Sequence, residues 1–325
     1  MKKSKLRNHA MISLTNEGGF GALIMVVWIV VMLMAIAGEF SYSMKTEINI
    51  MTNFKEEEEA YRLALAGIEK AKMELLLMKE PAYVYLNENS GLMLGEPEED
   101  GQEVMVMERK GELETGSFTY TIADEEGKIN INTASKEQIR AILIESGVDT
   151  EEVDTITDSI MDWRDGNDLH MLNGAEEDYY QSLDTPYSSK DGFFYVIEEL
   201  LLVKGMSPEI LYGLKGEEED GEEVIYTGLL DFFTVVGSGR TNINTASETV
   251  LETLFGTDNA LNIITQREAG PIKRPISKGQ VTSSYFTVMA TGTNGDGSIT
   301  RTVKAVLELR NKRLETHYWN DNYTG

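Results

Sequence analysis

The chain has 325 residues, of which 55 are acidic and 29 are Lys or Arg, so its formal net charge is −26 at pH 7. A surface this anionic repels phosphate backbones, which argues against nucleic acid as a partner and favours cations or basic protein surfaces. The chain contains no cysteine, so disulfides and thiol chemistry are excluded.

An uncharged apolar run of 19 residues, Phe20 to Gly38, lies close to the N-terminus. As a helix rising about 1.5 Å per residue it is about 28 Å long, close to the ~30 Å hydrocarbon core of a bilayer. The segment before it carries Lys2, Lys3, Lys5 and Arg7. This basic leader predicts that the N-terminus stays in the cytoplasm and that the chain after residue 40 lies across the membrane.

Three interpretations of the apolar run compete. It is a plain single-pass anchor, a secretory signal peptide cut after Ala35-Ile36-Ala37, or a prepilin-type signal cut between Gly19 and Phe20. Ordinary signal peptides are cut at the far end of the apolar run. The leader that ends in Gly18-Gly19 directly before Phe20 therefore favours the prepilin-type signal.

The helical pattern continues beyond the apolar run. The chain has no proline before Pro81, and Tyr61, Leu65, Ile68 and Leu75 recur at helical spacing. One helix over residues 22 to 80 is about 88 Å long and forms a stem with one end in lipid. A signal peptide that is removed needs no such extension, so this pattern also favours the prepilin-type signal.

With these features the chain resembles the K-type minor pseudopilin of type II secretion systems. Most pilins and pseudopilins carry Glu as the fifth residue of the mature chain, and in this family the K type is the subunit that lacks it. Counted from Phe20, the fifth residue here is Ile24. A carboxylate in lipid is costly unless a neighbour satisfies it, so a subunit without one suits the end of a filament.

The resemblance implies a function, partners and a location. The protein is expected at the tip of the pseudopilus, where it starts assembly and caps the filament for export of folded proteins across the outer membrane. The implied partners are the I- and J-type minor pseudopilins, the rest of the pseudopilus, inner-membrane lipid, and the prepilin peptidase that removes residues 1–19. The chain would cross the inner membrane once, with a periplasmic body and no enzymatic activity.

The pattern after Pro81 predicts an α+β fold. Alternating strands are expected over 116–123, 128–131, 284–291 and 299–309, the last two joined by a hairpin at Asn294-Gly295-Asp296-Gly297. Helical faces lie between the second and third of these strands. The resemblance implies a pilin-like long N-terminal helix plus an antiparallel sheet, with a large inserted helical domain. The expected divisions are a leader (1–19), a stem helix (20–80), a first sheet part (81–131), the helical domain (132–224) and a second sheet part (225–325).

An internal repeat relates residues 127–135 to residues 239–247, which share the sequence Asn-Ile-Asn-Thr-Ala-Ser. Each copy is expected to be a short strand that enters a helix. Ser135 with Gln138 predicts a capping box, and Thr245 with Glu248 predicts another, one register earlier. Asn132 and Asn244 are expected to hold the turns through side-chain to backbone hydrogen bonds. These roles are structural.

One acidic segment, residues 162 to 180, has the composition of a metal site. Clustered carboxylates repel one another unless a cation neutralises them, and oxygen-only ligands select hard ions such as Ca²⁺. The spacing is not that of an EF-hand, and a solvated acidic loop is the alternative. The resemblance implies bound, structural calcium in the helical domain. The carboxylates that match the family pattern are Asp162, Asp165, Asp168, Glu176 and Asp178.

A membrane-tethered DNA-uptake receptor is the alternative function. The Asn-Thr-Ala-Ser helices and the segment Leu202 to Met206 resemble parts of helix-hairpin-helix domains, but the net charge and a missing two-glycine hairpin argue against it. The three histidines, His9, His170 and His317, are scattered and form no His-x-x-x-His zinc pattern. Serine-nucleophile and phosphate-loop motifs are also missing from the sequence, so an enzyme is not expected.

Overall fold

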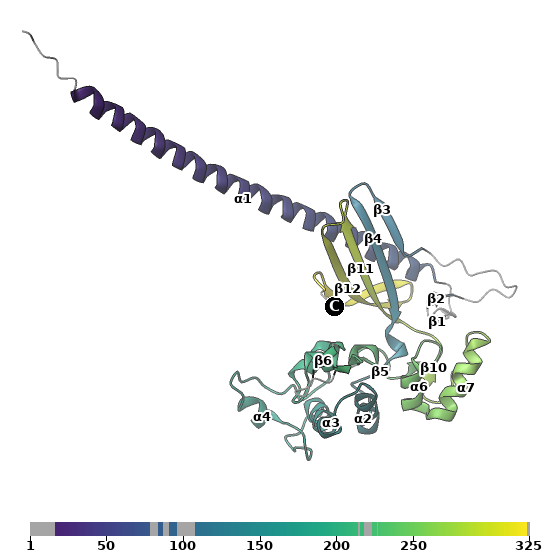
Figure 1. Cartoon of the computed structure of the whole chain (residues 1–325). Helices are drawn as coiled ribbons and strands as arrows, with labels where there is room; N and C mark the ends of the chain where they lie inside the picture. Colours follow the sequence, from purple (N-terminus) through teal and green to yellow (C-terminus); the bar gives the residue numbers. More distant parts are fainter. Residues whose placement is uncertain are drawn as a thin grey trace, which may run out of the picture. The chain divides into compact units, whose positions relative to one another are not determined.

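The computed structural model describes residues 17–78, 84–86, 91–95, 108–213, 215–217, 223–225 and 227–323, and the chain divides into two units, residues 1–56 and 57–325 (Figure 1). Helix α1, Glu17–Leu76, begins in the first unit and ends in the second. Residues 77 and 78 of the predicted stem over 20–80 thus follow the end of the helix, and residues 79 and 80 lie outside the described residues. Residues 1–16 of the expected leader, and Pro81, lie outside the described residues.

In length and composition α1 fits a single-pass membrane anchor. Its most apolar window has a mean hydropathy of 2.8, and none of that window is buried. The large apolar side chains from Phe20 to Phe54, Ile24 among them, are exposed. Exposed apolar surface of this extent is what a lipid-facing segment presents.

The second unit contains an antiparallel five-stranded sheet in the order β13-β12-β11-β4-β3. The strands are β3 (Lys110–Leu113), β4 (Gly116–Asp124), β11 (Tyr285–Asn294), β12 (Thr300–Arg310) and β13 (Arg313–Asn320). The predicted hairpin between β11 and β12 is present, with Asn294 paired to residues across the turn. Edge strand β13 is an element that the sequence pattern does not predict.

One core lies between this sheet and the last turns of α1 (Figure 1). Small residues let the two backbones approach: Ala60, Ala64 and Gly67 on the helix meet Ala290 and Gly292 on β11. A Cβ atom added to Gly292 would lie 2.1 Å from the Ala60 carbonyl oxygen. The helix therefore rests on strand β11 through main-chain contact that no larger residue permits.

We predict that Gly292→Ala destabilises the fold by about 1–3 kcal/mol, because the added methyl group meets helix backbone that cannot move aside. Thermal unfolding of the full chain in detergent, followed by circular dichroism, measures the change. Gly295→Ala is the matched control, since a Cβ atom there would have its nearest contact at an ordinary 3.4 Å. Equal melting temperatures for the two variants would contradict the close approach.

A second core is built from short helices and strands between and around the repeat copies. Its elements are η1 (Glu125–Gly127), β5 (Ile129–Asn130), α2 (Lys136–Glu145), α3 (Thr150–Arg164), α4 (Glu177–Gln181), η2 (Ile197–Leu202), α5 (Pro208–Tyr212), η3 (Leu229–Asp231), β8 (Phe233–Thr234), β9 (Thr241–Asn242), α6 (Glu248–Phe255), α7 (Thr257–Glu268) and β10 (Gly279–Gln280). Two short antiparallel pairs join β1 (Val84–Leu86) to β2 (Leu92–Leu94) and β6 (Lys215–Glu217) to β7 (Glu223–Ile225). The α+β class is as predicted.

Some details differ from the sequence-based expectations. Within the segment expected to be helical, residues Ile197–Leu202 form a 3-10 helix, η2, and the sequence pattern gives no separate signal for helix α7. Apolar residues from Leu229 to Val281 pack in the second core, whereas the predicted division assigns 225–325 to the sheet. The helical core therefore includes the second repeat copy and the helices that follow it, in addition to residues 132–224.

The two repeat copies fold alike. In each, a two-residue strand leads through a turn into a pair of helices, α2 and α3 in the first copy and α6 and α7 in the second. Arg164, at the end of α3, donates to the carbonyl oxygens of Ile131 and Ala134. Arg267, near the end of α7, donates in the same way to Ile243 and Ala246. Each arginine ties its second helix back to its own turn.

The turn contacts confirm one prediction and correct two others. Asn132 and Asn244 do not hold their own turns: Asn132 bonds both the N–H and the C=O of Phe194, and Asn244 does the same with Ile272. The turns are held by the side chains two residues earlier, which accept from the Asn132 and Asn244 N–H groups. Ser135 and Gln138 form the predicted capping box. The predicted Thr245–Glu248 cap is wrong: Ser247 caps α6, because the Thr245 hydroxyl is used by Asp124 and the Asn242 carbonyl.

Three consecutive acidic residues, Asp124, Glu125 and Glu126, join the two cores. The Asp124 carboxylate accepts hydrogen bonds from the Asn242 amide (2.9 Å), the Thr245 hydroxyl (2.6 Å) and the Ser283 hydroxyl (2.6 Å). Burial raises the pKa of Asp124 to about 6, although these bonds favour the ionised form. A turn to which the sequence pattern gives no role is thus a buried polar junction.

The neighbouring two carboxylates bind other elements. Glu125 accepts from Thr234 of β8 and Thr287 of β11, both at 2.7 Å, and pairs with Lys128. Glu126 accepts from the backbone N–H of Ser284, just before β11. The three side chains therefore connect the end of β4 to the helical core and to the start of β11.

We predict that Asp124→Ala costs about 3 kcal/mol of unfolding free energy, because the buried Ser283 hydroxyl and Glu126 N–H lose their acceptor and Asn242 and Thr245 each lose one of theirs. Urea denaturation of the full chain in detergent gives the value. Glu114→Ala, at an exposed position just before β4, is the control and is expected to change stability little. A small effect at Asp124 would mean that water replaces its bonds.

Candidate metal centre

Two carboxylates one turn apart on α3 hold the loop that comes after it. Asp158 and Asp162 have no exposed surface. Both oxygens of Asp162 lie 3.1 Å from the Met171 nitrogen, and Asp158 accepts from the backbone and side chain of Asn173 at 3.2 Å. Lys136 pairs with the other Asp158 oxygen at 2.5 Å. The i, i+4 spacing on one helix face thus fixes residues 171–173.

The loop has to approach the Asp162 carboxylate closely. A Cβ atom added to Gly174 would lie 1.9 Å from Asp162 Oδ2. Only glycine fits here, and the approach brings the next two residues, Ala175 and Glu176, into the interior.

Glu176 is the most unusual carboxylate of the site. It precedes α4, is 2% exposed, and neither of its oxygens has a hydrogen-bond partner among the described residues. Burial, reinforced by the charges of Asp162, Asp165 and Asp191, raises the pKa of Glu176 to about 7. A buried carboxylate without donors, facing other carboxylates, fits an oxygen ligand of a hard cation.

The five predicted ligands divide into two groups. Asp162, Asp165 and Glu176 come together, since their charges act on one another. Asp168 is exposed, and Asp178 is exposed with its Oδ1 2.9 Å from His170 Nε2. The structure therefore does not bring Asp168 and Asp178 to Glu176 in the way that their shared motif suggests.

Asp191 completes the group and is missed by the sequence-based prediction. It has a positive φ of 50° beside Gly192, whose N–H bonds the Trp163 carbonyl oxygen at 3.3 Å. The Asp-Gly pair after Lys190 is the one local signal of such a turn. Asp191 lies far from Asp165 and Glu176 in the sequence, so the spacing of the motif gives no sign that its charge acts on Glu176.

A cluster of aromatic side chains lies beside Asp162. Trp163, next to Asp162, meets Tyr180 edge-on at 5.1 Å between ring centroids and stacks with Phe194 at 6.5 Å. Tyr180 also contacts Tyr187 at 5.3 Å. Trp163, Tyr180 and Phe194 are all buried, so the chain next to Asp162 and Glu176 packs into an apolar interior.

Asp162, Asp165, Glu176 and Asp191 carry the oxygen ligands that calcium prefers, but no three of them have their donor atoms within 4.8 Å of one another in this structure. Calcium at this site stays a prediction, and its binding would draw these carboxylates together. Calcium–oxygen distances of 2.3–2.6 Å place ligands on opposite sides of the ion about 5 Å apart. Such an ion would join α3, α4 and the 191–192 turn, and its binding free energy would add to the stability of the fold.

We predict that calcium removes a pH dependence of folding stability that Glu176 creates. Without metal, the raised pKa of Glu176 means that its contribution to the unfolding free energy is full below about pH 4.5 and is lost as the pH rises through about 7. Saturating Ca²⁺ should remove this fall, since it stabilises the ionised form. Melting curves of the full chain in detergent between about pH 4.5 and 8, with Ca²⁺ or with a chelator, measure both effects.

The matched variants are Glu176→Gln and Glu152→Gln, the second at an exposed position on α3. Glu176→Gln should be insensitive to calcium and should lack the fall in stability. Glu152→Gln should behave as the unmodified chain does. A chelator that leaves the melting curve of the unmodified chain unchanged would show that no structural calcium binds.

The predicted processing site lies at the start of α1. Gly19 is helical in backbone, and the Phe20 side chain is 69% exposed. Cleavage between them stays a prediction.

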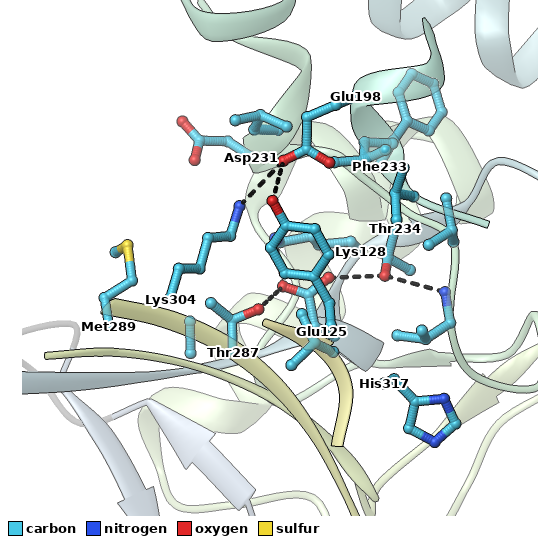
Figure 2. Close-up of a pocket in the computed structure, with 18 of the residues that line it drawn as sticks. Glu125, Lys128, Glu198, Asp231, Phe233, Thr234, Thr287, Met289, Lys304 and His317 are labelled. Carbon is cyan, nitrogen blue, oxygen red and sulfur yellow. Dashed lines mark hydrogen bonds and ion pairs between the residues drawn. The ribbon is translucent and has the colours of Figure 1, made fainter. Parts of the chain in front are cut away.

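A separate cavity of about 230 Å³ lies between the sheet and the helical core, and Figure 2 shows the residues that line it. Glu198 lies 3.8 Å from Lys304 Nζ and 3.4 Å from the Tyr318 hydroxyl, and Glu125 bonds Thr287 and Thr234 (Figure 2). In this cavity Glu198 thus pairs with Lys304, and Glu125 pairs with Lys128.

The comparisons with known proteins agree on one family. Residues 119–216 match the family model described as type II secretion system (T2SS), protein K. An Escherichia coli K12 protein whose name contains the words type II secretion system protein K is 29% identical over 148 residues, 45% of this chain and 40% of that protein. The type II secretion system protein K of Aeromonas hydrophila is 24% identical over 219 residues, 62% of each chain.

The chain spans between 40% and 62% of the length of these two relatives. Among solved structures, it matches a chain in the crystal structure of the GspK-GspI-GspJ complex from enterotoxigenic Escherichia coli. The TM-score is 0.52 and the identity 16%, and the match covers 86% of this chain and 99% of the other. At this identity the match shows a shared fold.

Proposed function

Because the chain belongs to the type II secretion system protein K family, we propose that it is the minor pseudopilin at the tip of a type II secretion pseudopilus. There it would start assembly and cap the filament that exports folded proteins across the outer membrane. The family match in the helical core, together with a shared fold over 86% of the chain, supports this role.

The N-terminal helix is the feature that best supports a position at the tip of the filament. It is apolar, and the large side chains from Phe20 to Phe54 remain exposed and available to lipid and to neighbouring stems. Its fifth residue after the proposed cleavage is Ile24, so it lacks a carboxylate that would seek a partner further up the filament. In lipid an ionisable group is kept only where it has such a partner.

The proposed partners are the I- and J-type minor pseudopilins. The related protein K was solved in a complex with GspI and GspJ. The body after α1 would lie in the periplasm, because the basic residues before Phe20 keep the N-terminus in the cytoplasm. The prepilin peptidase would act at the cytoplasmic face, between Gly19 and Phe20.

The protein is proposed to act by assembly, without catalysis. Calcium bound by Asp162, Asp165, Glu176 and Asp191 would be structural and would brace the loops after α3. The alternative function, a DNA-uptake receptor, is not favoured: the repeat turns use their Asn side chains inside the fold, and the net charge is −26.

We predict that the mature protein begins at Phe20. Intact-mass analysis of the chain isolated from membranes should show the loss of residues 1–19, and Gly19→Leu should retain them because the peptidase no longer meets a glycine. A start after Ala37, or a protein released free of the membrane, would contradict the pseudopilin role.

The same variant tests function in cells. Deleting the gene should leave exoproteins in the periplasm, and the unmodified chain should restore their release. Gly19→Leu should not restore it, whereas Ser4→Ala, a leader substitution away from the cleavage site, should. Normal secretion in the deletion strain would show that the protein acts elsewhere.

A further inference from the structure

Three metal-ligating side chains meet on the free edge of the five-stranded sheet. They are Glu308 of β12 and Glu315 and His317 of β13. Their donor atoms all lie within 4.8 Å of one another. Among the described residues this is the one group of three or more His, Asp or Glu side chains with that spacing.

The strand pairing brings them together. Glu308 and Glu315 are direct cross-strand partners, an arrangement in which like charges repel. A register shift beside them pairs Leu307 with Thr316 and Val306 with Tyr318, so His317 is the extra residue of a bulge. The bulge aims the imidazole at the pair, with His317 Nε2 2.7 Å from Glu308 Oε2.

A residue on the third strand orients two of these ligands. Tyr285 of β11 is the cross-strand partner of Glu308, and its hydroxyl interacts with the Glu308 carboxylate. Its ring meets the His317 ring edge-on at 5.4 Å between centroids. Glu308 itself is held with 13% of its side chain exposed. Partners of this kind fix the geometry of ligands in metal sites.

We propose that Glu308, Glu315 and His317 bind a divalent transition-metal ion of the Zn²⁺ class. Two carboxylate oxygens and one imidazole nitrogen are ligands that zinc accepts in a tetrahedral site, with the fourth position open to water. The ion would neutralise the cross-strand repulsion. The imidazole distinguishes the site from the all-carboxylate cluster around Glu176, since Ca²⁺ and Mg²⁺ prefer oxygen ligands.

The site borders the cavity of Figure 2. His317 lines that cavity and lies apart from the hydrogen-bonded group at its centre (Figure 2). Glu315 and His317 are both exposed, so an ion bound there would be open to solvent.

Isothermal titration of Zn²⁺ into the full chain in detergent tests the proposal, with saturating Ca²⁺ present so that the cluster around Glu176 is occupied. We expect one zinc site that is lost in His317→Gln and in Glu315→Gln. Both side chains are exposed, so the variants should keep the melting temperature of the unmodified metal-free chain. Glu112→Gln, at an exposed position on β3 of the same sheet, is the control and should bind zinc normally.

A second measurement separates the proposed site from adventitious binding. Tyr285→Phe keeps all three ligands and should weaken zinc binding about 10–100-fold, the usual effect of removing a partner that orients a ligand. Co²⁺ in place of Zn²⁺ should give the visible absorption of a tetrahedral complex in the unmodified chain and not in His317→Gln. Equal zinc affinity in the unmodified chain and His317→Gln would overturn the proposal.

Discussion

The two cores of the body depend on one buried polar turn. Asp124, Glu125 and Glu126 place three carboxylates in succession at the end of β4, and each accepts hydrogen bonds from a different set of elements. Burying such groups is costly unless every oxygen is satisfied. The requirement that Asn242, Thr245 and Ser283 all reach Asp124 fixes the second repeat copy against the sheet. The sheet in turn keeps its close contact with α1 through Gly292.

Much of this fold was predictable because its signals are local. The stem helix, the β11–β12 hairpin and the Ser135 cap each arise from neighbours in sequence. Elements that depend on distant partners were missed. Strand β13, with the alternating pattern of an exposed edge, pairs only through β12, and the cap at Ser247 results from Thr245 being engaged by Asp124. A turn residue's role is set by which distant donor or acceptor reaches it.

The candidate metal centre shows the same limit. Asp162 and Glu176 belong to a recognisable motif, and the structure buries both. Asp168 and Asp178 belong to that motif and stay exposed, while Asp191, outside it, acts on Glu176. The spacing of Glu308, Glu315 and His317 in the sequence does not predict that they meet, because the cross-strand register and a bulge bring them together. Sequence patterns identify ligand types, and tertiary pairing decides which of them meet.

The hydrogen bonds that Arg164 and Arg267 donate to the repeat turns affect where the chain can accept longer loops. Arg164 and Arg267 each anchor a helix pair to its own turn, so each copy is internally braced. The segment after α3 can then lengthen without loosening the module that precedes it. In the first copy a long acidic loop follows α3. In the second copy the chain returns to the sheet soon after α7. Two modules with the same contacts thus serve different ends: the first carries the acidic loop, and the second leads directly into the sheet.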